Sequence, residues 1–168
     1  MPVQPPRKEG DRNPQTADEA KALVKHVESL FMPWNIDALV AGFADDCVVR
    51  FGTLREFRGR EALRAFFVGR SSKQKGYRLK KSFRTLTNDT ITNIWEGEWQ
   101  DAESGTAMRG FGVELWVMRA GKIAEIRAYF MSADDAHCEL AGFPYGERGY
   151  LGMAADLAAT ASAVRRAG

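Results

Sequence analysis

The clearest pattern along the chain is a pair of alternating apolar and polar runs between residues 109 and 131. The two runs flank a tight turn at Arg119-Ala120-Gly121-Lys122. A period of two is what a pleated strand imposes on its side chains, so this stretch predicts an antiparallel hairpin. In the first strand, Glu114 shares a face with Trp116 and Met118. If that face lines a cavity, a carboxylate points into an apolar space.

Two further strands are predicted at residues 77–87 and 90–100, with turns at residues 88–89 and 103–105. Together with strands at 106–118 and 122–131 they make a four-stranded antiparallel meander. In the second of the four, alternation places Asn93, Trp95 and Trp99 on one face, which we expect to be the inner one. A bulge at Gly110 or Gly112 would reverse the phase of Glu114.

Helical spacing precedes the strands. A helix is expected after a cap at Thr16 or Asp18 and ends before Pro33, a short second helix follows Asn35 or Asp37, and a third opens at residues 59–61. A strand at 47–51 and a short edge strand at 55–58 lie between the last two helices, and a polar loop is expected at 71–76. This order predicts an α+β fold: a cone-shaped, strongly curved antiparallel sheet wrapped on about three N-terminal helices, because βαβ alternation is absent.

The two ends of the chain differ from its middle in composition. Residues 1–17 hold four of the six prolines and no core-forming cluster, so a disordered or loosely docked arm is expected there. Residues 18–132 form the predicted domain. Residues 133–168 form a C-terminal extension whose alanine-rich part, 151–166, predicts an extra helix.

Composition excludes several classes of function. The net charge of +2 is balanced along the chain, which argues against nucleic acid as a partner. No apolar run is long enough to span a membrane, and the start of the chain lacks a secretory pattern, so a cytoplasmic location is expected. Two distant cysteines indicate neither a disulfide framework nor a metal site. No nucleotide-binding or metal-binding motif is present, so no cofactor is implied.

Several segments resemble the nuclear transport factor 2-like superfamily, in particular its SnoaL-like and ketosteroid-isomerase-like small proteins. They are NIDALVAGFADDCVV, RGREALRAFF and GFGVELWVMRAGKIAEIRAYFM, within a resemblance that covers about residues 20–132. The segments YRLKK, EWQD and GVELW look most similar to an uncharacterised bacterial branch. The resemblance implies the cone-shaped fold, but this fold hosts isomerases, cyclases, dehydratases, hydrolases and non-catalytic adaptors.

The resemblance can be followed into the site of ketosteroid isomerases, which uses a tyrosine, a base and an acidic hydrogen-bond donor. Those places correspond here to Val27, Phe51 and Glu114. Two of the three groups are therefore missing, and steroid isomerisation by that mechanism is not expected. Glu114 alone keeps a carboxylic acid where the resemblance implies one.

Glu114 is the main catalytic candidate, with His26, Arg50 and Asn93 as possible helpers. Burial among aromatic side chains disfavours the charged form of a carboxyl group, which suits it to general acid or base catalysis near neutral pH. The alternative is that Glu114 is paired with a basic residue and only holds the sheet together. The candidate partners in that case are Arg50, Arg109 and Arg127.

The expected ligand is a small apolar or aromatic molecule in the cone. Its wall would be formed by Phe51, Trp95, Trp99, Phe111, Trp116, Met118 and Phe130. The first hypothesis is a cofactor-independent isomerase, cyclase or dehydratase that uses Glu114 for proton transfer. The second is a non-catalytic ligand-binding or protein-interaction module, which would gain if Glu114 were salt-bridged and the cavity closed. A homodimer through the outer sheet face is expected in either case.

Overall fold

The computed structural model of the chain describes residues 12–134. Most of the expected N-terminal arm and the C-terminal extension with its expected helix lie outside the described residues. Within residues 12–134, none of the helices is both long and apolar enough to cross a membrane.

The three described α-helices begin where the sequence places their caps. Helix α1 spans Ala17–Ser29, and the Thr16 hydroxyl accepts a hydrogen bond from the backbone N–H of Glu19 at 3.2 Å. Helix α2 spans Ile36–Ala41, and the Asn35 side chain accepts from the backbone N–H of Ala38 at 3.1 Å. Helix α3 spans Gly59–Lys73. The caps of α1 and α2 each satisfy a backbone donor that the first helical turn would otherwise leave unpaired, whereas Arg58 before α3 makes no such side-chain bond.

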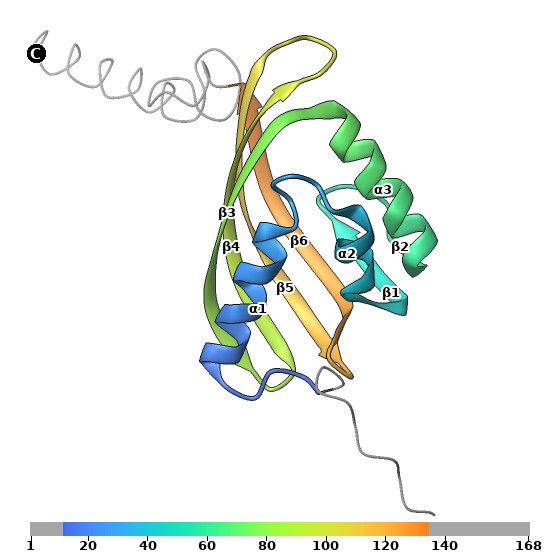
Figure 1. Ribbon diagram of the computed structural model, residues 1–168, viewed down its shortest axis with the longest axis vertical. Helices are drawn as coiled ribbons and strands as arrows, with labels where there is room; N and C mark the ends of the chain where they lie inside the picture. The colour runs from blue at the N-terminus through green and yellow to red at the C-terminus, as the bar shows by residue number, and fades with distance from the viewer. Residues whose placement is uncertain (1–11, 135–168) are drawn as a thin grey trace, which may run out of the picture.

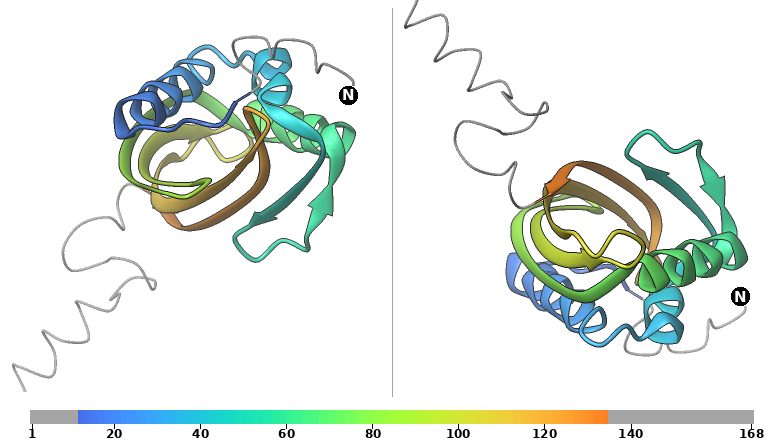
Figure 2. Two further views of the ribbon diagram at one scale, coloured as in Figure 1. Left: turned by 90° about the horizontal axis from the view of Figure 1, so that it is seen from below. Right: turned by 90° about the horizontal axis from the view of Figure 1, so that it is seen from above.

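Six strands form one sheet in the order β2-β1-β6-β5-β4-β3. The strands are β1 (Phe43–Phe51), β2 (Phe57–Arg58), β3 (Gln74–Thr87), β4 (Thr90–Asp101), β5 (Ala107–Arg119) and β6 (Lys122–Asp134). The predicted meander from β3 to β6 is confirmed, and β1 joins β6 in parallel, which the sequence analysis does not anticipate. The sheet is curved and unclosed, and the helices lie along its inner side (Figures 1 and 2). This arrangement confirms the α+β class.

The predicted polar loop at residues 71–76 is wrong. Helix α3 continues to Lys73 and β3 starts at the next residue, Gln74. The hydroxyls of Ser71 and Ser72 donate to the carbonyls of Val68 and Gly69, each at 2.9 Å. These bonds to the preceding turn let small polar residues remain helical at an exposed helix end.

The phase of the hairpin is as predicted. Strands β4 and β5 pair without interruption from Thr90 opposite Val117 to Gln100 opposite Ala107. No bulge occurs there at Gly110 or Gly112, and Glu114 therefore faces the helices. The opposite, outer face of the sheet carries Phe111, which is 45% exposed. The expected homodimer through this face stays a prediction.

The core lies between the inner sheet face and the helices. Trp116, Ile91 and Ile123 of the sheet and Val24 and Leu63 of the helices are almost fully buried. Rings from separate segments also meet there, with Phe31 4.9 Å from Trp34 and 6.0 Å from Phe67 between ring centroids. Edge-on contacts of this kind favour aromatic packing.

Gly112 lies where the backbone of β6 is close to β5. A Cβ atom at this position would come within 2.4 Å of the Tyr129 carbonyl oxygen and 2.7 Å of the Phe130 Cβ atom. We expect Gly112→Ala to lower the free energy of unfolding by about 1–3 kcal/mol, because the two strands must move apart. Urea denaturation of the variant and the wild type would measure this change in the free energy of unfolding. Gly69→Ala is the control: that site has open space around it in α3, so the substitution should stabilise by about 0.5–1 kcal/mol. Equal effects at both glycines would contradict the close strand approach.

Candidate functional site

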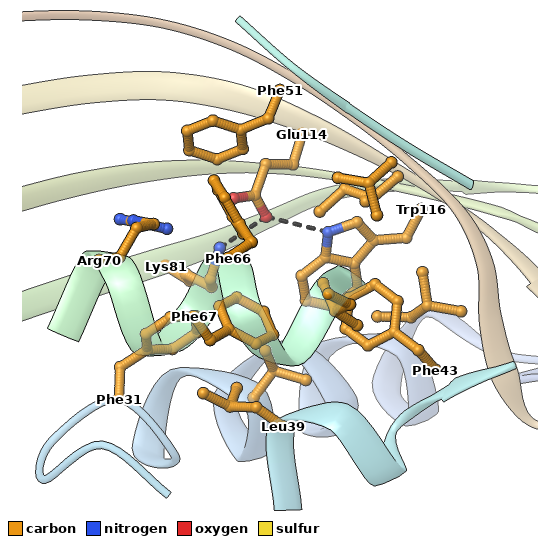
Figure 3. Close-up of a pocket in the computed structure, with 15 residues that line it drawn as sticks. Phe31, Leu39, Phe43, Phe51, Phe66, Phe67, Arg70, Lys81, Glu114 and Trp116 are labelled. Carbon is orange, nitrogen blue, oxygen red and sulfur yellow. Dashed lines mark hydrogen bonds and ion pairs between the residues drawn. The ribbon is translucent and has the colours of Figure 1, made fainter. Parts of the chain in front are cut away.

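Glu114 lies on the inner face of β5 and is 7% exposed. Its Oε2 atom accepts a hydrogen bond from the Lys81 Nζ atom at 2.6 Å, and the Lys81 side chain is 2% exposed (Figure 3). The same oxygen accepts from the Trp116 Nε1 atom at 2.9 Å. The centre of the site is therefore a buried, hydrogen-bonded ion pair.

Lys81 is the residue that sequence reasoning missed. It lies on β3, where Tyr77, Leu79 and Lys81 are buried and the intervening Arg78 and Lys80 are exposed. The sequence analysis expects basic partners for Glu114 from other strands and proposes no role for Lys81. The alternation along the strand could have identified it. Lys81 is two residues from Leu79 and four from Tyr77, so its side chain points to the same inner face as theirs.

Asn93 lies between the two charged residues. It is directly opposite Glu114 in the β4–β5 register and is fully buried. Its Oδ1 atom is 3.5 Å from Lys81 Nζ, whereas its Nδ2 atom has no hydrogen-bond partner among the described residues. A buried donor without an acceptor is costly, so this amide group is suited to a bound water.

Burial lowers the pKa of Lys81 below its ordinary 10.5, because the charged ammonium loses its hydration. The carboxylate of Glu114 opposes this shift through its charge and hydrogen bond, and Arg70 adds to it by like-charge repulsion. An ammonium with a lowered pKa releases its proton more readily than a surface lysine. Lys81 can therefore take part in proton transfer in either direction.

The ion pair lies at the wall of a cavity of about 30 Å³. That volume holds about two water molecules. Most of the surrounding side chains are apolar, so water is largely excluded and charges interact more strongly than in solution. The residues around the cavity include Val27, Phe31, Phe43, Val49, Phe51, Phe66, Phe67, Arg70, Lys81, Glu114 and Trp116. The three positions compared with ketosteroid isomerases, Val27, Phe51 and Glu114, thus meet at one cavity.

Arg70 of α3 reaches the same cavity from one side (Figure 3). Its guanidinium carbon lies 5.1 Å from the Phe51 ring centroid and 5.7 Å from that of Phe66. Its Nη2 atom donates to the Tyr77 hydroxyl at 3.3 Å, and its Nε atom donates to Gln74 Oε1 at 3.1 Å. Within residues 12–134, no carboxylate forms an ion pair with Arg70.

An open groove of about 450 Å³ lies beside the cavity, between α3 and the ends of β3, β4 and β5. Phe66 and Arg70 line both spaces, and Trp99 and Met108 form much of the apolar remainder of the groove. A volume of this size is in the range of small-molecule sites. Phe66 and Arg70 therefore lie at the boundary between the cavity and the groove.

The structure brings several of the predicted wall residues to this region. Phe51 and Trp116 line the cavity and Trp99 lines the groove. Phe130 lies next to them, with its ring centroid 4.7 Å from that of Phe51 and 6.0 Å from that of Trp95. Met118 faces inward but is buried in the core, outside the lining of the cavity.

Three predicted site residues lie elsewhere. His26 is exposed, because α1 buries Ala20 and Val24, and residue 26 falls on another side of the helix. Arg50 forms ion pairs with Glu56 and Glu125 and lies outside the cavity lining, since Phe51 takes the inward position on β1. Phe111 is on the outer sheet face, in the opposite phase to Glu114. These three side chains therefore lie outside the lining of both the cavity and the groove.

Metal binding has no support in the described part of the chain. Residues 12–134 contain no group of three or more histidine, cysteine, aspartate or glutamate side chains placed as metal ligands would be.

Residues 13–141 match the family described as "Protein of unknown function (DUF1348)". The chain belongs to the DUF1348 family. No curated protein matches its sequence. The family match covers the whole site of this DUF1348 protein, including both members of the ion pair.

Two solved structures resemble this DUF1348 protein in fold. One is the epoxide hydrolase/cyclase-like enzyme SalBIII, described in pyran ring formation in the polyether salinomycin, with a TM-score of 0.64 and 15% identity over 72% of this chain and 99% of that chain. The other is a candidate polyketide cyclase from Pseudomonas putida KT2440, with a TM-score of 0.55 and 17% identity over 66% and 90%. At these identities the likeness shows the fold alone, so membership of the SnoaL-like, nuclear transport factor 2-like superfamily and of the expected branch stays a prediction.

We expect Lys81→Met to lower the free energy of unfolding by about 3–5 kcal/mol, because Glu114 would remain buried without its cation. The double variant Lys81→Met/Glu114→Gln should be considerably more stable than the single one, since it removes both charges and keeps an acceptor for Trp116 Nε1. Lys80→Met on the exposed face is the control and should change stability by at most about 0.5 kcal/mol. Urea denaturation would compare them, and equal losses in the single and double variants would contradict the pairing.

The lowered pKa of Lys81 also predicts a pH dependence. Below the folded-state pKa, Lys81 is charged in both the folded and the unfolded chain, and burial of its charge lowers the free energy of unfolding by the full amount. Between that pKa and 10.5 the unfolded chain binds a proton that the folded chain does not, so the free energy of unfolding rises with pH in this window. We expect wild type to gain stability relative to Lys81→Met/Glu114→Gln as pH increases there. Urea denaturation at several alkaline pH values would test this, and a constant difference would contradict it.

Proposed function

We propose that this protein is a small-molecule enzyme that catalyses cofactor-independent proton transfer, as an isomerase, cyclase or dehydratase does. The observation that carries the proposal is the Lys81–Glu114 pair, a carboxylate and an amine held 2.6 Å apart at the wall of a largely apolar cavity. Groups with these properties are typical of general acid–base sites.

The two groups suit opposite halves of one reaction. Glu114 has a carboxylate that accepts a proton from a carbon next to a carbonyl group. Lys81 has three N–H donors, of which one is used by Glu114 and another faces Asn93 at 3.5 Å. The third is available to the substrate oxygen on which negative charge develops. Stabilising that charge in a site with little water is a strong source of catalysis.

The dimensions of the site restrict how a substrate binds. The cavity of about 30 Å³ admits only the reacting end of a molecule, whereas the groove of about 450 Å³ admits its remainder. Phe66, Trp99 and Met108 give the groove an apolar and partly aromatic surface. This supports a small apolar or aromatic substrate, as the sequence analysis expects, and the cyclase-like neighbours of the same fold agree with a reaction of this class.

A non-catalytic ligand-binding or protein-interaction module is the second candidate. Its supporting observation is that Glu114 is salt-bridged and that side chains fill most of the space around it. A buried ion pair can serve conformational specificity rather than chemistry. The two candidates differ in whether bound molecules exchange protons with the protein.

Exchange of carbon-bound hydrogen for deuterium tests the proposal without knowledge of the product. A panel of small ketones, aldehydes and esters, each with an aromatic or apolar substituent, would be incubated with the protein in D₂O and followed by NMR. We expect protein-dependent exchange next to the carbonyl of at least one compound. Glu114→Gln should slow it by about 10²- to 10⁴-fold, the usual contribution of a general acid or base.

Glu98→Gln is the matched control, because Glu98 pairs with Arg78 on the exposed side of the same sheet. It should leave exchange unchanged. Undiminished exchange in Glu114→Gln would rule out its role as the base. Compounds that raise the melting temperature but never exchange would favour the non-catalytic module.

A further inference from the structure

Lys81 differs from a surface lysine in its chemical setting. Its primary amine is at the wall of a largely apolar cavity, and its ionic partner, Glu114, can accept a proton. Lys80, the adjacent residue, is exposed on the other side of the strand. A desolvated lysine next to a proton acceptor is the arrangement in which an amine becomes a nucleophile toward carbonyl groups.

Arg70 adds an independent observation at the same cavity. Its guanidinium group forms no ion pair with the described residues, although two of its nitrogen atoms donate to the neutral side chains of Gln74 and Tyr77. The third nitrogen, Nη1, has no hydrogen-bond partner within residues 12–134. Arginine binds carboxylates strongly and often through two nitrogens, so a partly buried arginine without a carboxylate is suited to an anionic ligand.

Two buried polar atoms near the cavity are hydrogen-bond donors without an acceptor. Asn93 Nδ2 and Trp95 Nε1 are buried and have no hydrogen-bond partner among the described residues, and both residues are at least nine-tenths buried. Trp95 is the cross-strand neighbour of Lys81, and Asn93 is that of Glu114. Both residues lie beside the cavity and not in its lining, so an ordered water is the acceptor that suits these donors.

We propose that the site takes a small carbonyl compound with a neighbouring carboxylate, such as a 2-oxo acid, that Arg70 binds the carboxylate, and that Lys81 forms an imine with the carbonyl carbon. The proposal deepens the proposed function, because it names a substrate class for the same site, and it rests on that function only for the use of this cavity. In this proposal the carbonyl group enters the cavity of about 30 Å³, and the carboxylate and any longer substituent lie toward Arg70 and the groove.

Glu114 accepts and later returns a proton during imine formation. Its carboxylate takes one proton from the Lys81 ammonium, the nitrogen lone pair then attacks the carbonyl carbon, and a second proton moves from that nitrogen to the carbonyl oxygen. The resulting carbinolamine loses its hydroxyl group as water, with the proton supplied by the Glu114 carboxylic acid, and the C=N bond forms. The ammonium and the carbonyl compound thus give a protonated imine and one water, and Glu114 returns to its carboxylate form.

Reductive trapping tests this directly. The full chain would be incubated briefly with glyoxylate and sodium cyanoborohydride at neutral pH, followed by intact-mass measurement and peptide mapping. The expected product is one carboxymethyl group per chain, located on Lys81. Lys80→Met should leave this labelling unchanged. In Lys81→Met/Glu114→Gln, a variant that stays neutral at the buried positions, the label should disappear while the circular dichroism spectrum remains that of a folded protein.

Acetaldehyde, which lacks the carboxylate, separates the two parts of the proposal. Arg70→Gln should reduce labelling by glyoxylate about tenfold or more, the loss expected for a charge-assisted hydrogen bond, and should leave labelling by acetaldehyde nearly unchanged. Arg64→Gln, on the same helix but paired with Asp37, is the matched control and should not change labelling by either probe.

Two outcomes would overturn the proposal. Labelling of exposed lysines with Lys81 unmodified would overturn imine formation. An equal loss of labelling by glyoxylate and by acetaldehyde in Arg70→Gln would overturn carboxylate binding. Deuterium exchange that depends on Glu114 would then show that the proposed function survives without the imine.

Discussion

The buried ion pair between Lys81 and Glu114 is the interaction on which the site depends. Taking two charges out of water costs several kcal/mol for each, and their attraction offsets the cost only when the geometry is good and the remaining polar atoms are bonded. The second hydrogen bond to the carboxylate, from Trp116 Nε1, meets part of that requirement. The pairing also fixes the relative positions of β3 and β5, because one inner residue of each strand must reach across β4.

The strand between them completes the arrangement. Asn93 on β4 stands opposite Glu114, and its oxygen faces the Lys81 amine, so three adjacent strands each contribute one polar group to the inner face. Helix α3 closes the site from the other side and supplies Arg70. Apolar residues of similar volume would serve stability at least as well as a buried ion pair. The retention of charged groups here is therefore better explained by chemistry or specificity than by folding energy.

The sequence predicts much of this fold because its signals are local. The period of two around Glu114, the caps at Thr16 and Asn35, and the order of helices and strands each depend on residues close together in the chain. The partner of Glu114 was missed for the opposite reason: Lys81 meets it across an intervening strand, and a contact between residues 33 positions apart depends on register and sheet curvature. The parallel pairing of β1 with β6 is non-local in the same way.

The charges around the cavity also restrict the chemistry that it favours. The ionisable side chains that line it are Arg70, Lys81 and Glu114, which together carry one net positive charge when all are ionised. In a space with little water, such an excess stabilises a negative charge that develops on a bound molecule. Proton removal by Glu114 neutralises the only carboxylate of the lining and leaves both cations facing the new anion. The balance of charge thus favours enolate-like intermediates over cationic ones. This holds although Val27 and Phe51 occupy the positions that the resemblance to ketosteroid isomerases assigns to a tyrosine and a base.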